Sequence, residues 1–180
     1  VLAKYRFYES IIHSHARLTY TQVGEVLEQG SHADVDSQRV PDLKRLHSLY
    51  RVLRAARDKR GAIDFETVET RIIFDEHRKI EAIVPVVRND AHKLIEECML
   101  CANVATARFY DANKLPILFR VHEGPGEEKL EGLRKFLGEL GLDLGGGDKP
   151  TPVHYQQLLL QIVDREDANV IQTMLLRSLS

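Results

Sequence analysis

The chain has 180 residues, of which 43% are hydrophobic and 29% charged, and its 25 Lys and Arg nearly balance 27 Asp and Glu. This composition is typical of a folded globular domain with its own core and excludes a disordered or fibrous chain. The near-zero net charge argues against a protein that holds nucleic acid by overall charge, although a local basic groove remains compatible with it.

The sequence carries no signal for a membrane or for secretion. No apolar run approaches the length of a membrane span, and the first residues lack the order of a signal peptide. We therefore expect a cytoplasmic protein without membrane contact. The chain opens on Val1 and stops on Ser180 inside an apolar, helix-like stretch, so we expect an internal piece of a longer protein.

The first third of the chain predicts one strand and two helices. Aromatic and branched residues favour a strand over 4–14. Thr19 and Gln22 have the spacing of a capping box and predict a short helix. A polar loop over 30–38 then leads to an amphipathic helix over 41–61, which ends on a glycine.

The middle of the chain changes from a helical to an alternating pattern. The segments 62–66, 69–75 and 79–87 read as strands, the last two joined as a hairpin. A short strand is expected over 115–125. Apolar residues at helical spacing predict further helices over 130–140, after Thr151 and after Asp167. The expected class is α+β, with helices that dominate and pack on a small antiparallel sheet.

One long helix over 88–114, capped by Asn89, organises these elements. Apolar residues cover both sides of its middle, so we expect it to be buried nearly all round. Glu96 and Glu97 lie inside this apolar ring, where an unpaired carboxylate would cost several kcal/mol. Each should therefore have a partner.

Glu96 shares one helix face with Asn89, His92 and Asn103. Two interpretations are open: a structural ion pair or cap network, and a functional polar row. His92 and Glu96 also have the spacing of two metal ligands, but the sequence offers no third ligand. Cys98 and Cys101 form a C-x-x-C in mid-helix, where no dipole lowers a thiol pKa, so we expect them to be core residues.

Two aromatic residues are ambiguous. Phe65 alternates with acids on a short strand, which favours a ring that faces the core. Tyr20 stands where an extended segment gives way to a helix. No catalytic triad, phosphate-binding loop or aspartate cluster can be identified, so no catalytic residue and no metal ligand is predicted.

Five stretches together resemble the RNB-type catalytic domain of 3′ to 5′ exoribonucleases, of the ribonuclease R type. They are IHSHARLTY, RDKRGAIDFE, RNDAHKLIEECMLCAN, LFRVHEGP and QTMLLRS, in the family's order. The resemblance implies a channel that admits single-stranded RNA and hydrolysis to nucleoside 5′-monophosphates by two metal ions, expected to be Mg²⁺.

The resemblance also limits what this chain can supply. It implies that residues 1–180 are a partial RNB domain. The family's metal-binding aspartates should lie before Val1 and its SPIRRY-type arginine motif after Ser180. The piece should then be inactive alone.

Three residues match family positions that contact RNA. The resemblance implies that Phe65 stacks on bases near the 3′ end. Tyr20 and Glu96 match the pair that approaches ribose, where a 2′-hydroxyl distinguishes RNA from DNA. The alternative is a non-catalytic interaction module with a structural polar network on its long helix; the oligomeric state stays open under either reading.

Overall fold

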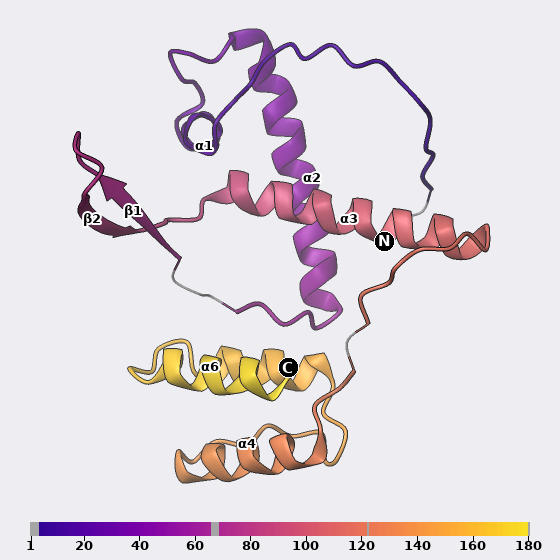
Figure 1. Cartoon of the computed structure of the whole chain (residues 1–180), viewed down its shortest axis with the longest axis vertical. Helices are drawn as coiled ribbons and strands as arrows, with labels where there is room; N and C mark the ends of the chain where they lie inside the picture. Colours follow the sequence, from indigo (N-terminus) through magenta and orange to yellow (C-terminus); the bar gives the residue numbers. More distant parts are fainter. Residues whose placement is uncertain (1–3, 66–68, 122, 180) are drawn as a thin grey trace. The chain divides into compact units, whose positions relative to one another are not determined.

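The computed structural model describes residues 4–65, 69–121 and 123–179 (Figure 1). The chain divides into two compact units, Val1–Ala56 with Val87–Phe119, and Arg57–Val86 with Arg120–Ser180. Each unit is described by itself. Helices dominate, and the sheet has two antiparallel strands, which confirms the expected class. Within the described ranges, no helix combines the length and apolarity needed to cross a membrane.

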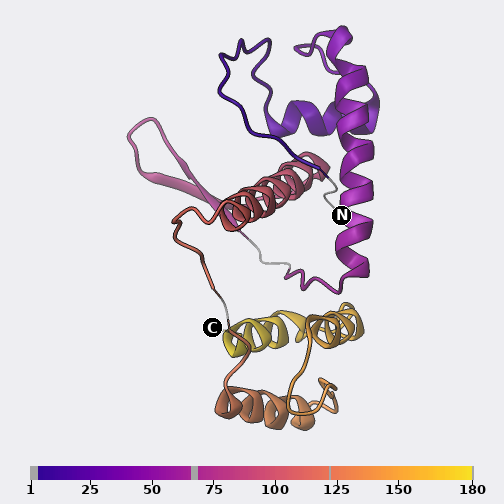
Figure 2. The same ribbon diagram turned by 90° about the vertical axis from the view of Figure 1, so that its right-hand side faces the viewer.

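The first unit is built from helices, two of which begin at a capping box. They are α1 (Tyr20–Gln29), a 3-10 turn (Ser37–Arg39), α2 (Val40–Lys59) and α3 (Asp90–Ala112). The predicted capping box is present: the Thr19 hydroxyl accepts from the Gln22 amide at 3.2 Å, and the Gln22 side chain accepts from the Thr19 amide at 2.8 Å. α1 packs on α3, and α2 runs across α3 (Figures 1 and 2).

A small apolar core holds the start of this unit together. Val26, Val35 and Leu43 are buried in one cluster. They come from α1, from the loop after it and from α2, so one cluster fixes three consecutive segments. Burying side chains of this size stabilises a fold by about 1.5–3 kcal/mol each.

The second unit contains the predicted hairpin, formed by β1 (Thr70–Phe74) and β2 (Ile80–Pro85). The strands pair from Thr70 opposite Pro85 to Phe74 opposite Ile80, with an irregularity after Ile73. At the turn, Oδ1 of Asp75 accepts from the amides of His77 and Lys79, both at 2.8 Å. This side-chain bonding replaces backbone partners and sets the register.

Three helices supply the core of the second unit, α4 (Glu127–Glu139), α5 (Pro152–Gln161) and α6 (Ala168–Ser178). α4 and α6 lie side by side in both views (Figures 1 and 2). Each helix contributes a leucine that is at most 1% exposed to one apolar cluster: Leu137, Leu158 and Leu175. The helices predicted over 130–140, after Thr151 and after Asp167 are thereby confirmed.

Three predicted strands are wrong in the described residues. The segments 4–14, 62–65 and 115–121 have no strand pairing, and residues 66 and 122 lie outside the described ranges. A strand needs a neighbour to satisfy its backbone groups. These segments have the composition of strands but no partner strand here. Ile11 and Ile12 accordingly lie exposed.

The prediction that α3 is buried all round is also wrong. Ala91, Leu94 and Ala105 are buried, but Met99 and Val104 are 58% and 42% exposed. The helix therefore buries one face of small and apolar residues and leaves an apolar face uncovered in the described structure.

Candidate functional site

The candidate residues of the first unit meet where α1 and α3 begin. Tyr20 is the first residue of α1, and its ring stacks on that of His92 in α3, with centroids 4.0 Å apart and planes 21° from parallel. Tyr20 remains 45% exposed. One face of the phenol ring is thus held by an imidazole while much of its surface faces solvent.

Asn89 ties the two helix starts together. Its Oδ1 accepts from the amides of Ala91 and His92 at 3.1 and 3.3 Å, which makes it the N-cap of α3, as predicted. Its Nδ2 donates to the Tyr20 carbonyl at 2.9 Å. Nδ1 of His92 lies 2.8 Å from Oδ1 of Asn89. The Asn89 backbone amide also donates to Nδ1 of His92 at 3.3 Å, which completes a capping box at the start of α3.

Gly24 makes room for this arrangement. A Cβ added at Gly24 would lie 2.3 Å from Nδ2 of Asn89. The sequence reading missed this residue, although a glycine inside an amphipathic helix is a signal of close approach. The Asn89 amide can reach the Tyr20 carbonyl only because the next turn of α1 carries no side chain.

Glu96 forms an ion pair with Arg88, through Nη2 and Oε2. The Glu96 side chain is 42% exposed and that of Arg88 is 29% exposed. Glu96 therefore has the expected partner, but it is not enclosed in an apolar ring. It lies one helical turn beyond His92, on the side where Tyr20 stacks. Nothing in the periodicity indicated Arg88, because it precedes the helix cap.

The neighbouring acid is the buried one. Glu97 is 4% exposed and is part of the interior of the first unit. Burial raises the pKa of the Cys98 thiol, with Cys101 and Glu97 adding to the rise. A raised pKa keeps the thiol protonated and unreactive. Cys98 and Cys101 are both partly buried, so the prediction that they are core residues is met only in part.

Phe65 belongs to the second unit. It is half-buried and packs against the helical core that contains Leu137 and Leu158. This is the core-facing orientation that the strand pattern favoured, although the residue lies in an extended segment rather than a strand. Tyr20 and Glu96 belong to the first unit, where Tyr20 contacts His92 and Glu96 contacts Arg88.

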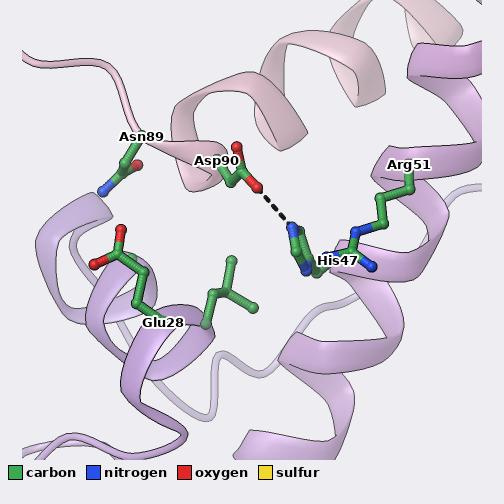
Figure 3. A pocket seen from close by; sticks show the side chains of 7 residues that line it. Glu28, His47, Arg51, Asn89 and Asp90 are labelled. Atoms are coloured by element: carbon green, nitrogen blue, oxygen red, sulfur yellow. Dashed lines mark hydrogen bonds and ion pairs between the residues drawn. The ribbon is translucent and has the colours of Figure 1, made fainter.

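A pocket of about 350 Å³ opens beside Asn89, between α1, α2 and the start of α3 (Figure 3). Glu28, His47, Arg51 and Asp90 contribute charged or titratable groups to its wall. Nε2 of His47 lies 2.7 Å from Oδ2 of Asp90, and the two side chains point toward one another in Figure 3. This hydrogen-bonded pair lies in the pocket wall, and neither Tyr20 nor Glu96 is among the lining residues.

The described part of the chain offers no metal centre. It contains no group of three or more His, Cys, Asp or Glu side chains able to hold an ion. His92 and Glu96, the pair with metal-ligand spacing, are instead engaged with Asn89, Tyr20 and Arg88. The described residues therefore provide no ligand set for the two metal ions that the resemblance implies.

Comparison with known proteins identifies the family of this chain. The model of the RNB domain matches residues 1–180. The chain belongs to the RNB domain family. Its resemblance to the ribonuclease R type is also confirmed: it is 58% identical over 179 residues to Ribonuclease R of Vibrio cholerae, and 51% identical over 181 residues to that of Escherichia coli.

The match covers nearly all of this RNB chain but a small part of each relative. It takes in 99% of this chain and 22% of either relative, so the chain spans about a fifth of their length. The fold is similar to Mycoplasma genitalium RNase R in complex with ribose methylated single-stranded RNA, with a TM-score of 0.81 and 31% identity. That alignment covers 89% of this chain and 25% of the other.

Proposed function

We propose that this chain is a segment of an RNB-family exoribonuclease that hydrolyses single-stranded RNA from its 3′ end to nucleoside 5′-monophosphates. The match of the RNB domain to all 180 residues carries the proposal. Support for the substrate comes from the similar fold of the Mycoplasma genitalium protein, which was solved with single-stranded RNA. The segment supplies part of the RNA-contacting wall and the recognition of ribose.

Tyr20 and Glu96 are proposed as the ribose contacts. Both are partly exposed, and both lie on the side of α3 where His92 stacks. A carboxylate accepts a hydrogen bond from a 2′-hydroxyl, which DNA lacks, and the hydroxyl of a tyrosine can donate a hydrogen bond to the same group or accept one from it. These are the chemical properties needed to prefer RNA over DNA without reading its sequence.

Phe65 is proposed as a base-stacking residue, a role worth about 1–3 kcal/mol per base. Its packing against the core of the second unit means that only part of the ring is accessible. Phe65→Ala should weaken binding of short oligoribonucleotides in the intact protein. If their affinity is unchanged while the free energy of unfolding falls, Phe65 is a core residue only.

The metal ions, expected to be Mg²⁺, are proposed to bind outside this chain. The described residues provide no ligand cluster for them, so no step of hydrolysis is assigned to a residue here. We accordingly expect the 180-residue chain alone to be inactive. Hydrolysis of a labelled oligoribonucleotide by the purified chain would contradict this division of roles.

The test of the proposal measures RNA preference in the intact protein that carries the chain. Tyr20→Phe and Glu96→Gln should each reduce the ratio of kcat/KM for RNA over DNA of the same sequence. Glu81→Gln, an exposed acid on β2, and Tyr8→Phe, 77% exposed, are matched controls that should not. An unchanged ratio for Tyr20→Phe and Glu96→Gln would favour the alternative of a purely structural polar network on α3.

A further inference from the structure

Tyr20 and Glu96 are held by side chains at the start of α3 that have no assigned role. We propose that Arg88 and His92 are positioning residues, which fix the Glu96 carboxylate and the Tyr20 ring in the orientations that meet a ribose. The inference rests on the function proposed above. It adds two residues that determine the preference for RNA without being assigned a contact with it.

Arg88 holds Glu96 through one carboxylate oxygen. The ion pair uses Oε2, and in the described ranges Oε1 has no hydrogen-bond partner. An ionised carboxylate has about four lone-pair sites on its two oxygens. Glu96 can therefore accept a hydroxyl proton at Oε1 while Arg88 stays bound at Oε2. The pair is compatible with ligand contact because it leaves half of the carboxylate available.

Arg88 also limits the freedom of an exposed side chain. The Glu96 side chain is 42% exposed, so without a partner it would sample several rotamers. Ordering a side chain when a ligand binds lowers the affinity by about 2- to 10-fold. Arg88 orders the carboxylate before the ligand arrives. Its place just before the N-cap lets its side chain return along the helix to Glu96.

His92 holds the ring of Tyr20 in place, as Arg88 holds the carboxylate of Glu96. Its ring covers one face of the phenol at 4.0 Å, and Nδ1 is fixed by the 2.8 Å contact with Oδ1 of Asn89. Asn89 holds the Tyr20 carbonyl in turn. Both the backbone and one ring face of Tyr20 are thereby fixed, and an exposed ring is held in one orientation.

The test compares binding of two oligonucleotides to the intact protein in EDTA, where hydrolysis cannot proceed. One is RNA, and the other has 2′-fluoro groups, which cannot donate a hydrogen bond, at its 3′-terminal nucleotides. Arg88→Ala and His92→Ala should each lower the affinity for RNA by about 2- to 10-fold. The affinity for the 2′-fluoro oligonucleotide should stay within about twofold.

Conservative variants separate positioning from folding. His92→Phe keeps the stacked ring and should retain most of the preference for RNA, and Arg88→Lys should be intermediate because lysine lacks the fork geometry. Arg45→Ala is the matched control, since Arg45 forms an exposed ion pair with Asp42 in the same unit. It should leave the ratio of the two affinities unchanged.

Each outcome decides between the two proposals. If Tyr20→Phe and Glu96→Gln reduce the preference but Arg88→Ala and His92→Ala do not, the positioning roles are wrong and the proposed function stands. Equal loss of affinity for both oligonucleotides in Arg88→Ala would show a general phosphate contact and also overturn its positioning role. If none of the four changes the ratio, the proposed ribose contacts themselves are wrong.

Discussion

Gly24→Ala tests whether the close approach of α1 and α3 depends on the missing side chain. The new Cβ would lie 2.3 Å from Nδ2 and 3.1 Å from Cγ of Asn89. Contacts this short force the Asn89 side chain to move. Since Asn89 caps α3 and binds the Tyr20 carbonyl, its movement should loosen both helix starts.

The expected magnitude follows from opposing contributions. Alanine inside a helix is favoured over glycine by about 1 kcal/mol. Loss of the N-cap costs about 1 kcal/mol, and loss of the bond to the Tyr20 carbonyl costs about another 1 kcal/mol. Gly24→Ala should therefore lower the free energy of unfolding by about 1 kcal/mol, against the direction of helix propensity.

Gly132→Ala in α4 is the matched control, because its added Cβ meets nothing within 4 Å. It should raise the free energy of unfolding by about 0.5–1 kcal/mol. Urea unfolding followed by circular dichroism measures both variants, and amide hydrogen exchange locates the change. Protection should fall in α1 and at the start of α3. A Gly24→Ala variant as stable as Gly132→Ala would refute the role given to Asn89.

Three further predictions concern the second unit. Tyr155→Phe should raise the free energy of unfolding by about 1 kcal/mol in urea titration, because the buried Tyr155 hydroxyl has no hydrogen-bond partner in the described structure. Arg78→Gly should raise it by up to about 1 kcal/mol, since Arg78 has a left-handed φ of 60° in the hairpin turn. The hydrogen bond from Arg165 lowers the pKa of the Asp167 carboxyl. The stability that this hydrogen bond adds is therefore fully present above the ordinary pKa of an aspartate and is lost as the pH falls through the lowered pKa. The free energy of unfolding should accordingly differ less between pH 6 and pH 2 in Asp167→Asn than in the unchanged chain.

Helix starts could be predicted from the sequence because their signals are local. The Thr19 and Gln22 box and the Asn89 cap each involve residues within three positions of one another, and both are present. Such bonds form within one turn and need no information about the rest of the chain. The hairpin from Thr70 to Pro85 was predictable for the same reason, since its pairing is set by its own turn.

Local signals could not show whether the other predicted strands, such as residues 4–14, would pair. Residues 4–14 have the composition of a strand, but whether they pair depends on a partner elsewhere in the chain. Composition reports the preference of a segment for extended backbone and says nothing of that partner. The stack of Tyr20 on His92 was hidden for a related reason. The two rings lie far apart in the sequence, and no periodicity connects them.

The two glutamates show where the burial argument succeeds and where it fails. A rotation of 100° separates Glu96 from Glu97 around the helix, so an apolar pattern that surrounds both cannot tell which one points inward. The structure buries Glu97 to 4% exposure and leaves Glu96 half-covered beside Arg88. A buried carboxylate is costly to rearrange, whereas a partly exposed one with a fixed partner can still accept a bond from a ligand. The cost of burying a charge therefore applies to Glu97. Glu96 is the better candidate to accept a hydrogen bond from a ligand hydroxyl because it is accessible, which the sequence did not indicate.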